Sequence, residues 1–442
     1  MNRVAVLHRP GLAYEVEPVR NALENLFRTL GLDQARAGTP DWNPLGDRIA
    51  PGDQVVVKPN LVSSRSRQNA MSPAQLQASC THGSLLRPVL EYALRAVGPR
   101  GSVTVVDAPL EGCALDEVMG PLGVRAVLGE LGVDFLDLRR FRLERHMLLD
   151  GTRLLGRSCN LGVLAHRRLP GDPRGSVTVD LGERSRFVDA RVDPARLCFH
   201  RSHRHDPAAH HSRGRHEYSI PRTILEADVI ISLPKLKTHK KAGVTLGLKS
   251  AIGLSDQKYW LPHFTEGAGG DEYERAPRVR ERIEDRLSRL TLPGGHALIA
   301  WAPRIDRAPR AMDGSWQGND TLWRTILDLN TILTYADRDG CLRPEAQRRS
   351  LTIVDGIVGG DREGPLEPRP VPAGLLLAGF DPVLVDREAA RLMGFDPTLI
   401  PHLAHAGAGP GVVERRLDGA EPALHFETPR SWPRLRSPSE SA

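Results

Sequence analysis

Cysteine, lysine and long apolar runs are scarce in this chain of 442 residues. Its five cysteines are scattered without a C-x-x-C pair, which argues against disulfides, a zinc knuckle and an iron–sulfur cluster. That cysteine usage is typical of a reducing cytoplasm. The N-terminus has no signal-peptide apolar region, and no run reaches the roughly 18 apolar residues of a membrane span. We therefore expect a cytoplasmic protein without a membrane span.

Charge and aromatic content also narrow the function. The net charge is +6, and only 5% of the residues are aromatic. Arginine is dense between residues 139 and 215, but this segment does not have the pattern of a nucleic-acid-binding stripe with interleaved aromatic residues. The composition, 40% apolar and 26% charged, is ordinary for a soluble globular protein. An anionic small molecule is therefore the expected partner, and nucleic acid is not.

Only seven of the 60 basic residues are lysine. Six of the seven lie between residues 235 and 258, and the seventh is Lys58. Lysine offers what arginine does not: a compact ammonium group that can shift its pKa or form an imine. We interpret the retained lysines as functional, and a basic loop that kept its lysines by chance is the alternative.

Residues 227–272 contain most of the residues on which this interpretation depends. The first seven of them form a short apolar, β-branched run that predicts a buried strand, and Pro234 ends it. His239 is a single histidine beside several cations that would lower its pKa, so it is the best candidate for a general base or metal ligand. Seven candidate site residues follow the strand: Lys235, Lys237, His239, Lys249, His263, Asp271 and Glu272.

An earlier part of the chain predicts a second group of site residues. Residues 53–62 and 102–109 have strand patterns, and a helical pattern over 85–97 lies between them. This spacing implies parallel strands, and ligands bind outside the carboxyl ends of such strands. Thr81 is the expected N-cap of the helix, and a turn-capping role is the alternative for Asp107. The candidates are Lys58, Asn60, Thr81, His82 and Asp107.

The histidine-rich segment 201–216 has two interpretations. Histidine is the commonest metal ligand, which favours a metal site. A solvated basic loop, or one that folds over an anionic substrate, is the interpretation we prefer, because low-complexity histidine tracts bind metals only loosely. His205 and His216 are kept as site candidates.

Residues 313–335 predict a turn followed by a helix that Thr321 or Asp320 caps. Asn319 and Arg324 lie at the start of this helix, where the helix dipole favours an anion.

Residues 351–358 predict another buried strand, which Asp355 and Gly356 end. The glycine-rich turn that follows is neither a Walker loop nor GxGxxG, although it suits a phosphate. This region adds the candidates Gly359, Gly360, Asp355 and Glu363.

Together these elements predict an α/β fold of two Rossmann-like lobes, with mostly parallel sheets, a cleft between the lobes and long irregular insertions. The expected divisions are an N-terminal lobe over 1–145, an Arg/His-rich insertion over 146–222, a second lobe over 223–410 and a loose C-terminal tail over 411–442.

Six ordered motifs resemble a known family: KPNLV at 58–62, TH at 81–82, VVDAP at 105–109, ADVIISLPKLKTH at 227–239, GVTLGLKSAIG at 243–253 and IVDGIVGG at 353–360. They resemble the bacterial and archaeal domain-of-unknown-function family 362. YWLPHF at 259–264 and WQGNDTLWR at 316–324 resemble its branch without ferredoxin modules, often met among polysaccharide and natural-product biosynthesis genes. That branch implies no iron–sulfur cluster. The family usually has Asn where this chain has Ser250.

A weaker similarity is to the nickel-pincer lactate racemase fold, in which a His and a Lys serve the cofactor. His239 and Lys249 stand in comparable order, and fold alone does not settle function.

Three functions follow from these observations. The first is a biosynthetic enzyme for a phosphorylated or carboxylated small molecule, in which Lys58, Lys235 and Lys237 neutralise the anion. Its acid–base groups, or its ligands for a divalent metal (iron, manganese, magnesium or zinc), would be Asp107, His263, Asp271, Glu272, Asp355 and Glu363. The second is a cofactor-dependent 2-hydroxy-acid or sugar epimerase or oxidoreductase, with Lys249 or His239 moving a proton or hydride. The third is a non-catalytic anion- or metal-binding protein.

Overall fold

The structure is a computed structural model. It describes residues 3–66, 69–154, 157–188, 193–199, 206–267, 269–274, 291–292, 296–301, 313–407 and 414–436. The candidate His205 lies outside the described residues. Within them, no helix combines the length and apolarity that crossing a membrane requires.

An 11-stranded, mostly parallel sheet forms the centre of the molecule, and its main strand order is β20-β1-β19-β17-β11-β2-β3-β4. Strands β17, β11, β2, β3 and β4 are parallel, whereas β19 runs antiparallel to both of its neighbours. The strands are β1 (Arg3–His8), β2 (Gln54–Pro59), β3 (Ser102–Asp107), β4 (Phe135–Asp137), β11 (Val229–Leu233), β12 (Lys235–His239), β13 (Gly243–Val244), β17 (Arg349–Glu363), β18 (Glu367–Val371), β19 (Leu375–Gly379) and β20 (Glu414–Gly419).

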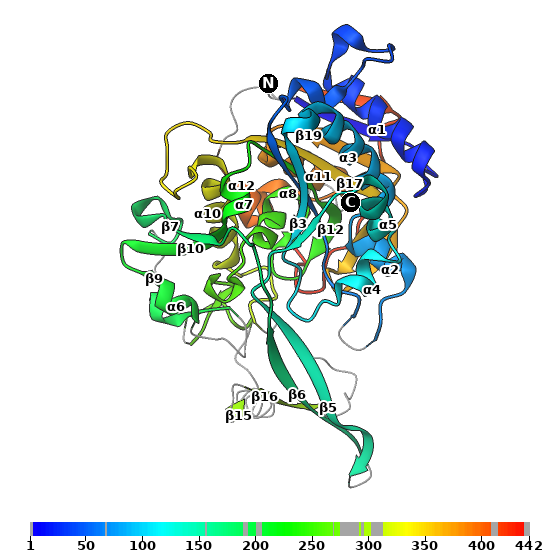
Figure 1. Ribbon diagram of the computed structural model, residues 1–442. Helices are drawn as coiled ribbons and strands as arrows, with labels where there is room; N and C mark the ends of the chain where they lie inside the picture. The colour runs from blue at the N-terminus through cyan, green and yellow to red at the C-terminus, as the bar shows by residue number, and fades with distance from the viewer. Residues whose placement is uncertain are drawn as a thin grey trace.

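Helices cover both faces of this sheet, so its strands are apolar on both sides, as parallel strands usually are. On β2, Val55 and Val57 contribute to one buried cluster and Val56 to the other, which is the alternation of a pleated strand. Figure 1 shows α1, α3 and α5 on one side of the molecule and α8, α10 and α12 on the other. The longer helices are α1 (Val16–Leu30), α2 (Pro73–Ser79), α3 (Gly83–Val97), α5 (Val124–Leu131), α10 (Leu322–Tyr335) and α11 (Pro382–Leu392). The shorter ones are α4 (Leu115–Met119), α6 (Asp206–His210), α7 (Arg222–Leu225), α8 (Leu246–Ser250) and α12 (Pro401–Ala404).

The α/β class with a mostly parallel sheet is confirmed, but two separate lobes are not. Strand β2 pairs with β11, and β1 pairs with β19, so strands from both predicted lobes alternate in one sheet. A strand pattern indicates which faces are buried and carries no information about which strand lies beside it. The predicted boundaries at 145 and 222 therefore do not separate two sheets.

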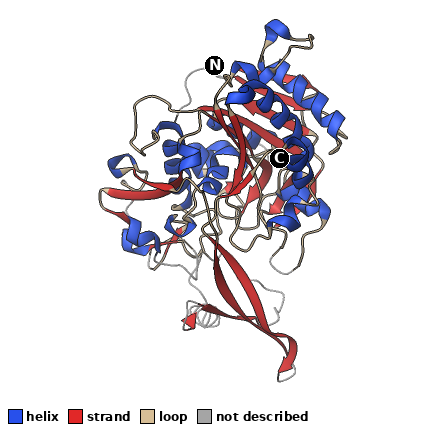
Figure 2. Ribbon diagram, viewed as in Figure 1, coloured by secondary structure: helices blue, strands red, loops and turns tan. Residues whose placement is uncertain are grey.

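Smaller sheets extend from this centre. The long strands β5 (Phe141–Leu154) and β6 (Arg157–Arg168) form a hairpin that projects from the rest of the molecule (Figure 2). The remaining strands are β7 (Ser176–Asp180), β8 (Leu197–Cys198), β9 (His211–Ser212), β10 (Arg215–Pro221), β14 (Phe264–Thr265), β15 (Thr291–Leu292) and β16 (His296–Trp301).

The C-terminal segment, expected to be a loose tail, packs on the sheet over residues 414–436. Strand β20 pairs in parallel with β1. Phe426 and Trp432 are fully buried, and Trp432 Nε1 donates to the carbonyl oxygen of Lys240 at 2.6 Å. Two aromatic anchors in a Pro- and Arg-rich segment are enough to fix it, because each large ring removes much apolar surface from water.

The glycine-rich segment after Asp355 is another correction. Strand β17 does not end at Gly356 but continues to Glu363. A Cβ atom on Gly359 would lie 2.6 Å from Phe426, and one on Gly360 would lie 2.6 Å from the carbonyl oxygen of Ala78. These glycines are explained by close packing inside the sheet rather than by a phosphate-binding turn.

Candidate functional site

Six of the chain's seven lysines line one pocket of about 510 Å³, which we call the lysine pocket. It lies beyond the carboxyl ends of β2 and β3, where open parallel sheets bind ligands. Two histidines, three hydroxyl residues, three carboxylates and one amide share its wall. These polar residues are Lys58, Lys237, Lys240, Lys241, Lys249, Lys258, His239, His263, Thr245, Ser250, Ser315, Asp107, Asp313, Glu363 and Asn60.

The ends of β2 and β3 contribute a buried ion pair. Lys58 Nζ lies 2.9 Å from Asp107 Oδ1 and donates to the carbonyl oxygen of Pro59. Asp107 Oδ2 accepts from the backbone N–H of Leu61 at 2.8 Å. A Cβ atom on Gly253 would lie 2.6 Å from Asp107 Oδ1, so only glycine lets that segment pass over the pair. Lys58 and Asp107 thus lie at the carboxyl ends of their strands, as expected, and the structure adds that they pair with each other.

Lys237 and Asn60 form the next part of the wall. Lys237 Nζ donates to Asn60 Oδ1 at 2.6 Å and also to the carbonyl oxygen of Ser79. Burial lowers the pKa of Lys237 to about 7. Thr81, predicted to bind substrate, instead joins two strand ends: its hydroxyl accepts from Asn60 N and donates to the carbonyl oxygen of Leu233, each at 2.7 Å.

Lys249 projects from the α8 segment and is surrounded by other ammonium groups. Burial, followed by the charges of Lys237, Lys258 and Lys58, lowers its pKa to about 7. The pKa of Lys258 is also lowered, to about 8, mainly by burial. Gathering several cations is unfavourable without an anion, because each like charge disfavours the protonated form of its neighbours.

The two histidines of the pocket hold their protons on different ring nitrogens. His239 Nδ1 lies 3.1 Å from the backbone N–H of Lys241 and must accept from it, so the neutral ring holds its proton on Nε2. His263 Nδ1 lies 2.9 Å from the carbonyl oxygen of Leu261 and must donate to it, so its lone pair is on Nε2. Burial first, and nearby lysines second, lower both pKa values well below the ordinary range. His239 is therefore a donor toward a ligand, and His263 is an acceptor.

Lys235, Asp355 and His82 form a separate buried cluster that does not line the lysine pocket. Lys235 Nζ lies 3.0 Å from Asp355 Oδ1, to which the Tyr14 hydroxyl also donates at 2.6 Å. The His82 ring stacks on Tyr14 at 4.1 Å, and its Nδ1 accepts from Ser84 N at the start of α3. His82, rather than Thr81, thus caps this helix. The sequence had no motif around Tyr14 that signalled its contact with Asp355.

Four other predicted residues have structural partners: Asp271, Glu272, Asn319 and Arg324. Asp271 accepts four hydrogen bonds, from the backbone and hydroxyl of Thr265 and from Asp320 N and the Thr321 hydroxyl. Glu272 is buried and its N–H donates to the carbonyl oxygen of Thr265. Neither of these acids lines the lysine pocket.

Asn319 and Arg324 hold the start of α10. Thr321 holds the N-cap position, as expected, but the side-chain cap comes from Asn319, whose Oδ1 accepts from Leu322 N at 2.8 Å. Arg324 pairs with Asp320 at 2.9 Å and donates to the carbonyl oxygen of Arg186. Both side chains support the fold, and neither residue lines the lysine pocket.

Of the six predicted metal ligands, Asp107, His263 and Glu363 line the lysine pocket, whereas Asp271, Glu272 and Asp355 do not. Asp355 belongs to the Lys235 cluster, and Glu363 pairs with Lys240 at 2.9 Å. Among the residues that the structure describes, no three His, Cys, Asp or Glu side chains are placed to hold a metal ion. The donor set present in the lysine pocket does not fit a divalent cation, because lysine ammonium groups outnumber carboxylates there.

His216 lies in a packed aromatic group away from the lysine pocket. Its Nδ1 is 3.3 Å from His211 Nδ1, and its ring stacks on Phe187 at 5.8 Å. Burial lowers the pKa of His216. These contacts indicate a packing role for this histidine.

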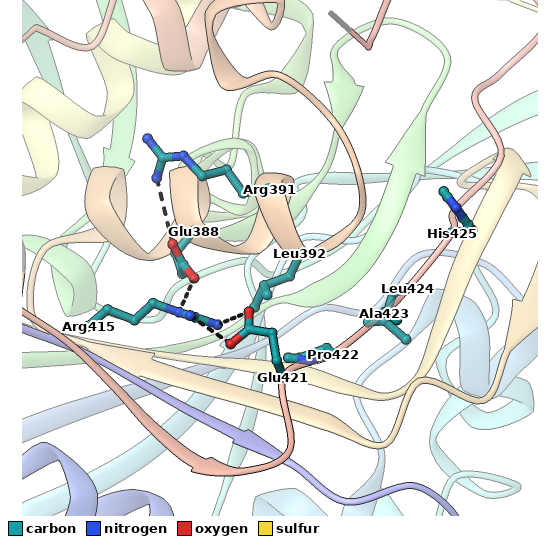
Figure 3. A pocket seen from close by; sticks show the side chains of 9 residues that line it. All are labelled: Glu388, Arg391, Leu392, Arg415, Glu421, Pro422, Ala423, Leu424 and His425. Atoms are coloured by element: carbon teal, nitrogen blue, oxygen red, sulfur yellow. Dashed lines mark hydrogen bonds and ion pairs between the residues drawn. The ribbon is translucent and has the colours of Figure 1, made fainter. Parts of the chain in front are cut away.

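A second pocket of about 410 Å³ lies between α11 and the C-terminal segment (Figure 3). Its charges are already paired: Arg415 contacts Glu388 at 2.6 Å and Glu421 at 2.7 Å. The lysine pocket is the better candidate site, because its six lysines outnumber the three carboxylates in its own wall.

Comparison with known proteins supports the three of the six ordered motifs that lie after residue 177. A thylakoid-associated protein of Synechocystis sp. is 23% identical over 217 residues, which are 49% of this chain and 45% of the relative. The chain thus spans about half the length of that curated relative. Residues 177–391, which include β11, β12, α8 and β17, match the family described as "Domain of unknown function (DUF362)". The expected family is confirmed, and residues 177–391 of this chain belong to it.

Proposed function

We propose that this chain is a biosynthetic enzyme that binds a phosphorylated or carboxylated small molecule in the lysine pocket. The observation that carries the proposal is the gathering of six of the seven lysines around one cavity. Of these, Lys58 and Lys240 have carboxylate partners within 3 Å, at Asp107 and Glu363. A bound anion would stabilise the ammonium groups at Lys237, Lys249 and Lys258, whose pKa values are lowered in the free protein.

The two histidines support a proton-transfer reaction on this anion. His239 offers an N–H, and His263 offers a lone pair, at the wall of one cavity. A donor and an acceptor flanking a substrate are what general acid–base catalysis requires. An epimerase-type abstraction of a proton next to a carboxylate is the reaction that this pair favours, with His263 as the base. No step is assigned to a metal, because the described donors do not form a site for one.

The binding proposal is tested by titrating the purified protein with inorganic phosphate, sulfate and malonate in a calorimeter. We expect at least one anion to bind, and Lys249→Met to weaken its binding by about tenfold or more, because a charge-assisted contact contributes about 1.5–3 kcal/mol.

Arg391→Met is the matched control. Arg391 lines the other pocket, so its loss should leave the dissociation constant unchanged. If none of the three anions binds the wild-type protein, or if both variants weaken binding equally, the lysine pocket is not the anion site.

The proton-transfer proposal needs a separate measurement. Candidate hydroxy acids are incubated in deuterium oxide, and exchange at the carbon next to the carboxylate is followed by proton NMR. His263→Gln should abolish exchange while leaving anion binding within about twofold of wild type. Exchange that survives His263→Gln would exclude His263 as the base.

A further inference from the structure

We infer that the α8 segment forms a subsite for a phosphoryl group, with Thr245, Ser250, Lys249 and His239 as its donors. This inference rests on the proposed anion-binding function and specifies its ligand. The substrate would then be a phosphate monoester, held by its phosphoryl oxygens at this wall of the lysine pocket.

Two buried hydroxyl groups without partners carry the inference. Thr245 is 1% exposed and Ser250 is 3% exposed, and both line the lysine pocket. Among the described residues, neither hydroxyl has a hydrogen-bond partner. A buried polar group without a partner is unfavourable, and native proteins satisfy most such groups. Two of them at the wall of one cavity therefore indicate a ligand that accepts hydrogen bonds.

The backbone of α8 cannot serve this ligand. Asp386 on α11 already accepts from the N–H groups of Gly247 and Leu248, each at 2.7 Å. A carboxylate of the protein thus occupies the position at the helix start that an anion would otherwise take. The ligand must be held by side chains, and the hydroxyls of Thr245 and Ser250 are the ones left unused.

Charged and neutral donors lie near the two hydroxyls. Lys249 directly precedes Ser250 in α8, and its ammonium is influenced by four other lysines. His239 is joined to this region through β12, because Thr238 pairs with Val244 and His239 with Gly243, just before Thr245. The proton on His239 Nε2 makes that ring a donor as well.

The number of donors distinguishes a phosphoryl group from a carboxylate. Two hydroxyls, one ammonium group and one imidazole N–H make a set of at least four donors. A carboxylate presents two oxygens in one plane, whereas a phosphate monoester presents three terminal oxygens that accept strong hydrogen bonds in three dimensions. Donors that come from two chain segments suit the three-dimensional arrangement of phosphate oxygens better than the planar carboxylate.

The test compares phosphate with malonate, which shares its negative charge and lacks tetrahedral oxygens. Thr245→Val and Ser250→Ala are prepared, and dissociation constants for both anions are measured by calorimetry. We expect each change to weaken phosphate binding about tenfold or more and malonate binding by less than threefold. Thr245→Ser, which restores the hydroxyl, should recover most of the phosphate affinity.

Stability of the free variants shows whether they fold. Thr245→Val removes a buried hydroxyl that has no partner, so the thermal midpoint should stay level or rise. A folded Thr245→Val variant with wild-type phosphate affinity, together with wild-type affinity in Ser250→Ala, would overturn the phosphoryl subsite while leaving the anion proposal intact. If no anion binds the wild-type protein, the broader proposal of an anion site fails first.

Discussion

At the scale of single residues, the ammonium group of Lys249 governs the charge of the lysine pocket near neutral pH. Its pKa of about 7 arises from burial and then from Lys237, Lys258, Lys58 and Lys241. An ordinary lysine, with a pKa near 10.4, keeps its charge throughout the physiological range. The pocket therefore gains positive charge as the pH falls through 7, and an anion adds to this effect by favouring the protonated form.

Sulfate binding reports the charge of the lysine pocket, because the charge of sulfate itself is constant between pH 6 and 9. We expect sulfate affinity to decrease as the pH rises from 6 to 9, as Lys249 and Lys237 lose their protons near pH 7 and Lys258 near pH 8. Calorimetry at each pH gives the slope. Lys249→Arg keeps its charge over this range and should flatten the slope. An affinity for sulfate that is the same at pH 6 and pH 9 would contradict the shifted lysines.

The same shifts make the free protein more stable at higher pH. A lysine whose pKa is lowered on folding binds fewer protons in the native state than in the unfolded state, between its native pKa and about 10.4. Stability should therefore rise from about pH 7 to about pH 10, because Lys249 and Lys237 are neutral in the native state over this range and still protonated in the unfolded state. Urea denaturation of wild type and Lys249→Met at pH 7 and 9 checks this, and the variant should gain less between the two pH values.

Asp355 is expected to be a structural residue, because Lys235, Tyr14 and the backbone of His82 all depend on it. Asp355→Asn leaves the Lys235 ammonium buried without its carboxylate, which should cost about 3–5 kcal/mol in the free energy of unfolding. Urea denaturation measures the loss.

Asp116 provides the matched control for that change, since it pairs with Arg125 on the surface. Asp116→Asn should cost no more than about 1 kcal/mol, because exposed ion pairs contribute little. The double variant Lys235→Met, Asp355→Asn should recover part of the loss. An equal loss at Asp116 and Asp355 would mean that burial of the pair does not matter.

At the scale of elements, α8 depends on a carboxylate from another helix. Asp386→Ala removes the acceptor for two N–H groups of α8, so we expect a loss of about 1–3 kcal/mol and weaker phosphate binding. Calorimetry and urea denaturation measure the two effects.

Asp381→Ala is the control that separates the loss of stability from the loss of phosphate affinity. Asp381 caps the start of α11, where it accepts from Val383 N at 2.8 Å. Asp381→Ala should lose about 1 kcal/mol of stability, as other cap removals do, with phosphate affinity unchanged. If Asp381→Ala weakens phosphate binding as much as Asp386→Ala does, the effect is general destabilisation and α8 has no special role.

At the scale of the whole molecule, the central sheet joins distant parts of the chain. β11 lies between β2 and β17, and β19 lies between β1 and β17. A fragment of residues 177–391, the part that matches the family, lacks both β1 and β2. Its buried strands would present unpaired backbone groups and apolar faces to water.

We therefore expect this fragment not to fold cooperatively. The proton NMR spectrum of the fragment should be poorly dispersed, and the fragment should bind the dye ANS. The full chain should give a dispersed spectrum and should not bind ANS. A dispersed spectrum and a sharp thermal transition for the fragment would show that the N-terminal strands are dispensable.

Local patterns were sufficient for several features of the site. Apolar runs predicted β2, β3 and β11, and placed Lys58 and Asp107 at the carboxyl ends of their strands. The scarcity of lysine directed attention to the lysines that remain, and six of the seven line one pocket. These features depend on local periodicity and on residue chemistry, which a sequence displays directly.

Other features were decided by tertiary contacts. The buried partner of Asp355, the donors to Asp271 from the start of α10 and the packing of Gly359 against Phe426 all depend on residues far away in the chain. Similarly, the order of strands in the sheet depends on which apolar faces pack best. The apolar patterns of the strands resemble one another, so they do not show which strands are neighbours. The sequence by itself determined the strands, the family and the lysine-rich chemistry of the site. Only the tertiary structure decided which polar residues face the pocket and which are held by other parts of the protein.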